Sequence, residues 1–211
     1  MDLRQVSGLL NHVGKLTTYQ DNCIKEDVPP YENYYMLEKS GEKWEYGLFI
    51  LERENNPYLR KIKEFNTEAE GAKYFLLDRL SSHYYSERVR PFIMDHTELD
   101  IGGPTFDEHK LVNAFSLIGI PSSLYVIDKS QINGRAIMLT QADDTNSIVS
   151  FIDSKGNTIQ STVPINNQRA LLITFRKVFM LYLFEQEVNQ LLEAENLNNV
   201  FSDKDINIFL S

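Results

Sequence analysis

The feature that most constrains this chain is an apolar stretch near its C-terminus, from about 167 to 195. Its apolar residues point in nearly every direction around a helix axis: Leu171, Leu172, Ile173, Phe175, Val178, Phe179, Met180, Leu181, Tyr182, Leu183 and Phe184. A helix that is apolar on all sides must be enclosed. We therefore predict a long helix that is buried in the core, with a dimer interface as the alternative.

A membrane span is a poor reading of the same stretch. Its longest unbroken apolar run, Val178 to Phe184, is far shorter than the ~20 residues that a span needs. Arg169, Arg176 and Lys177 would also be costly inside a bilayer.

The first ninety residues predict a helix, a β-meander and a second helix. Apolar residues recur every three or four positions over 2–19, which indicates a helix, and 21–30 ends in two prolines, which indicates a loop. Thr67 and Glu70 have the spacing of a capping box and predict the start of a helix that ends near Ser86. The predicted strands are 34–39, 43–53 and 58–65, and the short turns between them favour antiparallel pairing.

The second half predicts the same order of elements. Thr105 and Glu108 form another capping-box pattern before a helix that Gly119 ends. Asn133-Gly134 is the strongest hairpin signal, and 154–157 is a second turn. The predicted strands are 124–127, 136–140, 148–152 and 158–164.

These elements predict an α+β fold of antiparallel meanders flanked by helices, with the long buried helix at the C-terminal end. We expect a helix-meander-helix unit at 1–90, a connector at 88–104 and a second such unit at 105–211 packed on the first, together compatible with one compact domain. The repeated order of helices and strands is explained equally well by an internal duplication and by coincidence, because no residue-level repeat is evident.

The net charge of −9 argues against nucleic acid as a partner, because phosphate binding needs a positive surface. Residues 1–90 carry 13 basic and 15 acidic groups, whereas residues 91–211 carry 8 and 15, so most of the excess lies in the second half. Such a field favours a basic protein partner, although acidity also serves solubility alone.

The densest group of polar side chains lies between 95 and 109. Asp95, Glu98, Asp100, Asp107 and Glu108 alternate there with two histidines, and Asp143 and Asp144 lie in a later loop. We predict that these seven carboxylates form a patch that binds a basic partner. The plainer reading is a solvated acidic loop, with Asp107 and Glu108 favoured by the positive end of a helix.

Catalytic motifs are missing from the sequence. It has no phosphate-binding glycine loop and no nucleophile elbow. Cys23 is the single cysteine and lies among carboxylates, which should raise its pKa and weaken it as a nucleophile. We therefore expect no enzyme, no catalytic or metal-binding residues and no cofactor.

One cysteine also fits a reducing compartment, and the first residues lack the basic and apolar segments of a secretory signal. We expect a cytoplasmic protein without membrane contact. The basic run Arg60, Lys61 and Lys63 is typical of an edge strand protected by charge.

Residues 34–90 resemble the immunity proteins of bacterial polymorphic-toxin systems. The resemblance lies in the strand Lys43-Trp44-Glu45-Tyr46-Gly47-Leu48-Phe49-Ile50, the Asn-Asn-Pro turn after it and the aromatic-rich helix at 67–85. It implies a non-catalytic inhibitor that binds one cognate toxin, and it transfers no site residue.

Two other readings stay open at this point. One is a metal-dependent hydrolase that uses His96, His109 and the neighbouring carboxylates. The other is a structural or phage-assembly protein that forms a homodimer through the long apolar helix.

Overall fold

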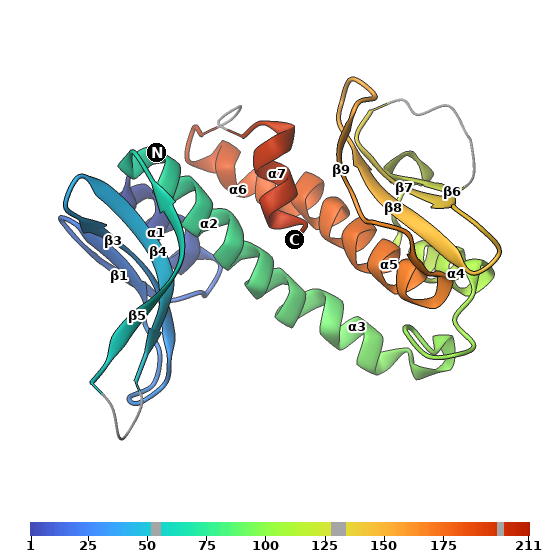
Figure 1. Cartoon of the computed structure of the whole chain (residues 1–211), viewed down its shortest axis with the longest axis horizontal. Coiled ribbons are helices and arrows are strands. Elements are labelled where there is room, and N and C mark those ends of the chain that lie inside the picture. The colour runs from blue at the N-terminus through green and yellow to red at the C-terminus, as the bar shows by residue number, and fades with distance from the viewer. Residues whose placement is uncertain (52–55, 128–133, 198–200) are drawn as a thin grey trace. The chain divides into compact units, whose positions relative to one another are not determined.

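The computed structural model describes residues 1–51, 56–127, 134–197 and 201–211, and it confirms the predicted α+β class (Figure 1). The chain divides into two compact units, Met1–His83 and Tyr84–Ser211. The long C-terminal helix is buried as predicted. Each unit is described by itself below.

The first unit contains a five-stranded antiparallel sheet in the order β1-β2-β3-β4-β5. The predicted meander is confirmed as its last three strands, and the basic run lies on the edge strand β5. The elements of the unit are α1 (Leu3–His12), β1 (Thr17–Gln20), β2 (Cys23–Glu26), β3 (Tyr34–Ser40), β4 (Lys43–Ile50), β5 (Tyr58–Phe65) and α2 (Glu68–Tyr84).

Two expectations for the first thirty residues are wrong. The helix predicted over 2–19 ends at His12, and Gly14 follows with a φ of 86°. The segment predicted as a loop at 21–30 contains strand β2, which pairs with β1. The β-branched Thr17 and Thr18 favour a strand, and Leu16, the last of the regularly spaced apolar residues that predicted a helix over 2–19, is 58% exposed.

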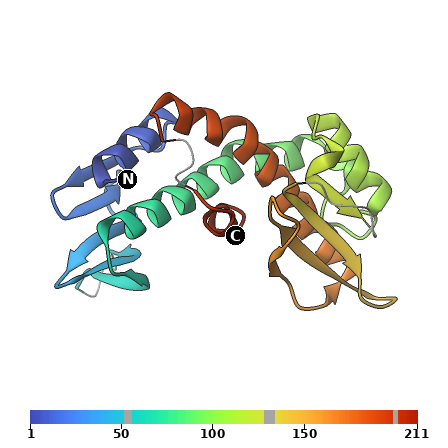
Figure 2. The ribbon, with the colours of Figure 1, turned by 90° about the horizontal axis from the view of Figure 1, so that it is seen from above.

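One face of this sheet carries both helices of the unit, as can be followed in Figure 2. The hydroxyl of Thr17 lies 3.0 Å from that of Ser7 in α1, and Tyr46 on β4 donates to Asp78 in α2. At the start of α2, the Glu70 N–H donates to the Thr67 hydroxyl and the Glu70 carboxylate accepts from the Thr67 N–H, so the predicted capping box is confirmed.

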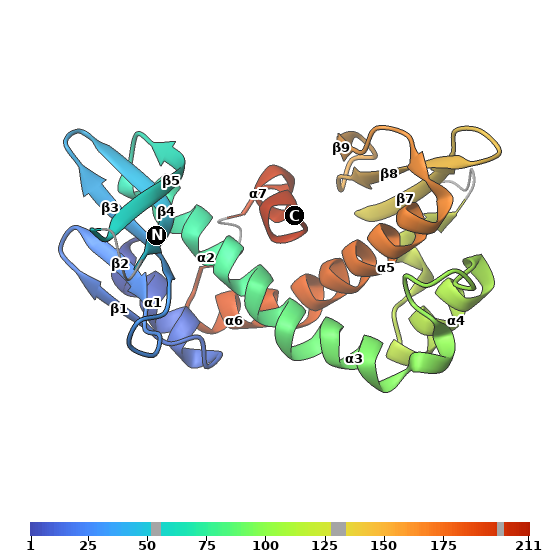
Figure 3. The ribbon, with the colours of Figure 1, turned by 60° about the horizontal axis from the view of Figure 1, so that its bottom comes forward.

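The second unit is built around α5, which packs against β7 and β8, as Figure 3 shows. Phe175 in α5 is fully buried, and the rings of Phe92, Phe106, Phe115 and Phe179 lie within 5.9–6.3 Å of its ring. The core reading of the apolar helix is therefore confirmed. The helices and turns of the unit are η1 (Tyr85–Val89), α3 (Arg90–Asp95), η2 (Thr97–Leu99), α4 (Glu108–Ile118), η3 (Ser122–Leu124), α5 (Asn167–Leu183), η4 (Phe184–Val188), α6 (Asn189–Ala194) and α7 (Asp203–Phe209), and the strands are β6 (Tyr125–Ile127), β7 (Ala136–Gln141), β8 (Asn146–Ile152), β9 (Thr158–Ser161) and β10 (Ile165–Asn166).

The helix expected to end near Ser86 continues to Asp95, so much of the predicted connector at 88–104 is helical. A π-turn, η1, joins α2 to α3, and Pro91, which has no N–H to donate, lies directly after this turn. The second long helix also contains a π-turn, η4, which joins α5 to α6.

The helix α4 begins later than its sequence pattern suggests. Asp107, not Thr105, caps it by accepting a hydrogen bond from the Lys110 N–H. Thr105 instead donates to Asp100, so the second predicted capping box is wrong. Gly119 ends the helix as predicted, with a φ of 83°.

The sheet of the second unit has the order β10-β8-β7-β6, with β9 also paired to β8. Strands β6 and β7 are parallel, so the hairpin predicted at Asn133-Gly134 is wrong; Asn133 itself lies outside the described residues. The turn at 154–157 between β8 and β9 is confirmed. The repeat of element order therefore does not extend to strand pairing.

Candidate partner-binding surface

The acidic loop before α4 is held together by its own carboxylates. Asp100 has a φ of 56° and accepts hydrogen bonds from the N–H and the hydroxyl of Thr105, both at 2.8 Å. These bonds lower the pKa of Asp100. Asp107 accepts from the Lys110 N–H at 2.8 Å. Both side chains therefore have local structural roles as well as charge.

The first turn of α5 anchors this loop. The side-chain amide of Gln168 donates to the carbonyl oxygens of Gly103 and Phe106, the latter at 3.0 Å. A Cβ atom on Gly103 would overlap the Asp100 carboxylate, so the loop leaves no room for a larger residue at that position.

The neighbouring residue of α5 anchors the second acidic segment. The Asn167 N–H donates to the carbonyl oxygen of Thr145 at 3.0 Å, and its side-chain amide donates to that of Asp144 at 3.2 Å. Asp143 accepts hydrogen bonds from Asn146 and from both the N–H and the hydroxyl of Thr145, and these bonds lower its pKa.

The structure therefore places two segments that are some forty positions apart around the N-terminal end of α5. We call the seven predicted carboxylates the acidic end of the second unit: Asp95, Glu98, Asp100, Asp107, Glu108, Asp143 and Asp144. Asp95 ends α3 and Glu98 lies in η2, and both are exposed. They belong to the group because they are close to Asp100 in sequence, not because a side-chain bond connects them to it. Lys110 adds a positive charge near Asp100 and helps to lower its pKa.

The seven carboxylates fall into two groups. Asp100, Asp107 and Asp143 are occupied by turn and cap hydrogen bonds. Within the described part of the chain, Asp95, Glu98, Glu108 and Asp144 make no side-chain hydrogen bond or ion pair. Asp95 is notable because a carboxylate at the C-terminal end of a helix opposes the helix dipole.

A small pocket opens at the acidic end. It has a volume of about 120 Å³ and lies where α4, β6, β7, β8 and α5 meet. Its lining residues are Glu108, Ile127, Leu139, Gln141, Ser147, Asn167 and Leu171. Ser147 donates to Asn167 at 2.8 Å, which fixes one side of the pocket.

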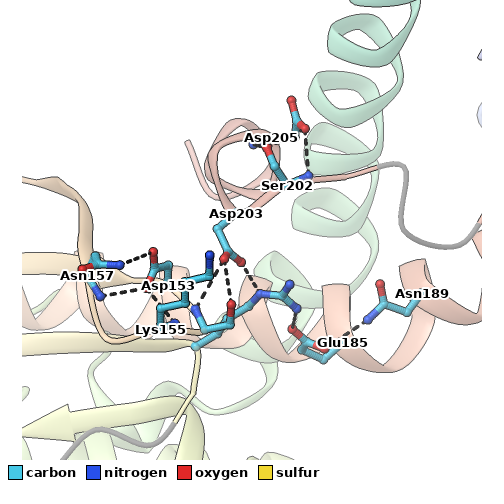
Figure 4. Close-up of polar contacts among 10 residues, drawn as sticks. Asp153, Lys155, Asn157, Glu185, Asn189, Ser202, Asp203 and Asp205 are labelled. Atoms are coloured by element: carbon cyan, nitrogen blue, oxygen red, sulfur yellow. Dashed lines mark hydrogen bonds and ion pairs between the residues drawn. The ribbon is translucent and has the colours of Figure 1, made fainter.

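A second polar cluster, missed from the sequence, attaches helix α7. Arg135 donates to Glu185 in η4 at 2.9 Å and also to Asp203 in α7. Asp203, which Figure 4 shows close to the turn that carries Lys155, also accepts from the Ser154 hydroxyl at 3.0 Å. Burial alone would raise the pKa of Asp203, but these donors lower it.

The other end of α7 is also held. Lys177 in α5 donates to the Leu210 carbonyl oxygen at 3.0 Å, and burial lowers the pKa of this lysine. A pocket of about 190 Å³ lies beside α7, with Arg135 and Glu193 among its lining residues. The partners of Arg135 are 50 and 68 positions away in sequence, so no local pattern could have indicated this cluster.

The first unit contains a buried ion-pair network that the sequence also did not reveal. Arg79 donates to Glu26 at 3.1 Å and to Asp78, and it stacks on the ring of Tyr35 at 3.6 Å. Burial and the neighbouring Asp78 raise the pKa of Tyr46, which keeps this phenol a hydrogen-bond donor. Through these bonds the network joins strand β2 to helix α2 within the first unit.

The residues considered for nucleophilic catalysis or metal binding form no common site in the described structure. The pKa of Cys23 is raised, as predicted, but burial is the main cause and the contributing carboxylate is Glu38. His96 stacks on Phe92 and contacts its carbonyl oxygen at 3.0 Å. Among the described residues, no three His, Cys, Asp or Glu side chains are grouped so that they could hold a metal ion. The hydrolase reading gains no support from them.

Comparison with protein-family models, with curated proteins and with solved structures finds no match to this chain. The described residues include no helix with the length and apolar character required to cross a membrane. The geometry of the acidic end is therefore the main guide to function.

Proposed function

We propose that this chain is a non-catalytic inhibitor that binds a basic partner protein through the acidic end of its second unit. By its resemblance to immunity proteins, the partner is a bacterial toxin and the site of action is the cytoplasm. The observation that supports this most is that residues 103–106 and residues 144–145, which adjoin the acidic side chains, both bond to the N-terminal end of α5.

The acidic end has more carboxylates than its turns and its helix cap need for hydrogen bonding. Three of the carboxylates stabilise turns and a helix cap, but Asp95, Glu98, Glu108 and Asp144 are exposed without such bonds in the described structure. Clustered like charges cost stability unless something opposes them. A basic partner supplies the opposing charge and is steered toward this end before contact.

The four exposed carboxylates allow a test that leaves the turns intact. We expect the variant Asp95→Asn, Glu98→Gln, Glu108→Gln and Asp144→Asn to associate with the partner on the order of tenfold more slowly, because steering charges act mainly on the association rate. The partner is obtained by capture from a lysate of the source cells on the immobilised chain, purified, and measured by surface plasmon resonance.

The matched control removes four exposed carboxylates of the first unit: Asp21→Asn, Asp27→Asn, Glu32→Gln and Glu42→Gln. Both variants have the same net charge. Equal association rates for the two variants would contradict the proposal, as would a captured partner that is acidic.

A further inference from the structure

We infer that the pocket at the acidic end receives one basic side chain of the partner, a lysine or an arginine, so that binding there is specific as well as electrostatic. This inference rests on the proposed function and assigns the pocket within it. The pocket has a volume of about 120 Å³, which is the scale of a single side chain and not of a metabolite.

The walls of the pocket suit an aliphatic stem. Ile127 and Leu139 contribute from the parallel strands β6 and β7, and Leu171 contributes from the first turns of α5. Lysine and arginine carry three or four methylene groups that pack on apolar surface while the charged end stays near polar groups.

The polar side of the pocket suits a cation. Glu108 and Gln141 line it, and within the described chain their side chains have no hydrogen-bond or ion-pair partner. Ser147 and Asn167 are already bonded to one another, and the Asn167 amide donates to the Asp144 carbonyl oxygen. The acceptors that remain are the Glu108 carboxylate and the Gln141 amide oxygen.

The nearby end of α5 does not make the pocket an anion site. The Asn167 N–H donates to the Thr145 carbonyl oxygen at 3.0 Å, and the Gln168 N–H donates to the Asn166 side chain at 2.9 Å. These bonds occupy the first two N–H groups that an anion would use at a helix start. Asp143 and Asp144 on the adjoining turn add further negative charge.

The test uses small probes on the full chain and needs no partner. Uniformly ¹⁵N-labelled protein is titrated with N-acetyl-lysine methylamide and N-acetyl-arginine methylamide, and with N-acetyl-norleucine methylamide, which keeps the stem and lacks the charge. We expect saturable amide shifts near 108, 141, 147 and 171 with at least one basic probe and none with the norleucine probe.

Glu108→Gln should weaken that binding about tenfold, the scale of one charge-assisted hydrogen bond. Glu42→Gln, an exposed substitution in the first unit with the same change in net charge, should leave it unchanged. The inference is overturned by the absence of saturable shifts, by shifts spread over the whole acidic end, by equal binding of the norleucine probe, or by equal effects of the two substitutions.

The two proposals fail separately. The probes report on the pocket without any partner. A variant with Asp95→Asn, Glu98→Gln and Asp144→Asn, which keeps Glu108, reports on the partner while the pocket stays intact. A partner that still depends on the acidic end when no probe enters the pocket would leave the proposed function intact and remove this inference alone.

Discussion

A buried carboxylate, Glu26, makes the stability of the first unit depend on pH. It accepts hydrogen bonds from Arg79 at 3.1 Å and from the Tyr35 N–H at 2.9 Å, and it lies 2.8 Å from the Lys15 ammonium. Burial alone would raise the pKa of Glu26, but these partners lower it below its ordinary 4.5. Because the folded-state pKa is depressed, the stabilisation is present above about pH 4.5 and is lost as the pH falls through the folded-state value.

We expect Glu26→Gln to lower the free energy of unfolding by about 3 kcal/mol at neutral pH, because it leaves the Arg79 charge buried with one carboxylate partner fewer. The deficit should shrink as the pH falls below about 4.5, since the wild-type carboxylate then becomes neutral too. Urea unfolding across this pH range measures both effects. Glu42→Gln, at an exposed turn, should change stability by less than about 0.5 kcal/mol; a deficit for Glu26→Gln that is independent of pH would contradict the assignment.

The acidic end could be predicted from the sequence only in part. The seven carboxylates were identifiable from their types and their spacing. Their division into structural and exposed groups was not, because it depends on which of them accept hydrogen bonds from Thr105, Lys110 and Thr145. The anchors Asn167 and Gln168 are ordinary polar residues at a helix start, and no local pattern distinguishes them.

Among the elements, helix α7 is held by buried apolar side chains, Ile206 and Phe209 among them, and by polar contacts at each end. Arg135 joins its first residue, Asp203, to Glu185, and Lys177 holds its last turn. We expect Arg135→Gln to increase amide hydrogen exchange in α7 about tenfold relative to β8, because two carboxylates lose a shared donor and local opening becomes easier.

The matched substitution is Arg88→Gln. Arg88 also bonds a carboxylate, Glu187 at 3.3 Å, but it is 54% exposed, and an exposed ion pair contributes little. Its exchange pattern should resemble that of the unmodified chain. Hydrogen–deuterium exchange with mass spectrometry would refute the role of Arg135 if both variants opened α7 to the same extent.

Elements specified by local signals were predictable, and elements specified by distant contacts were not. The Thr67–Glu70 capping box, the strand alternation at 34–65 and the all-round apolar α5 each depend on neighbouring residues. The parallel pairing of β6 with β7 contradicts the turn signal between them, and the docking of α7 depends on groups far away in sequence. The stripe over 2–19 misled because Leu16 contributes hydrophobicity at a position that the fold exposes.

For the whole molecule, the unequal distribution of charge predicts how partner binding responds to salt. The net charge is −9, and residues 91–211 hold 15 acidic against 8 basic groups. The Debye length falls from about 10 Å at 0.1 M salt to about 3 Å at 1 M, so steering by this field is strong at low salt and nearly absent at high salt. We expect the association rate constant for the basic partner to fall at least about tenfold over that range, while the dissociation rate constant changes much less because it reflects short-range contacts.

The four-site variant should show a flatter salt dependence than the first-unit control variant, although both carry the same net charge. Stopped-flow measurements at increasing sodium chloride test this, and parallel slopes for the two variants would show that net charge, not its position at the acidic end, governs the encounter.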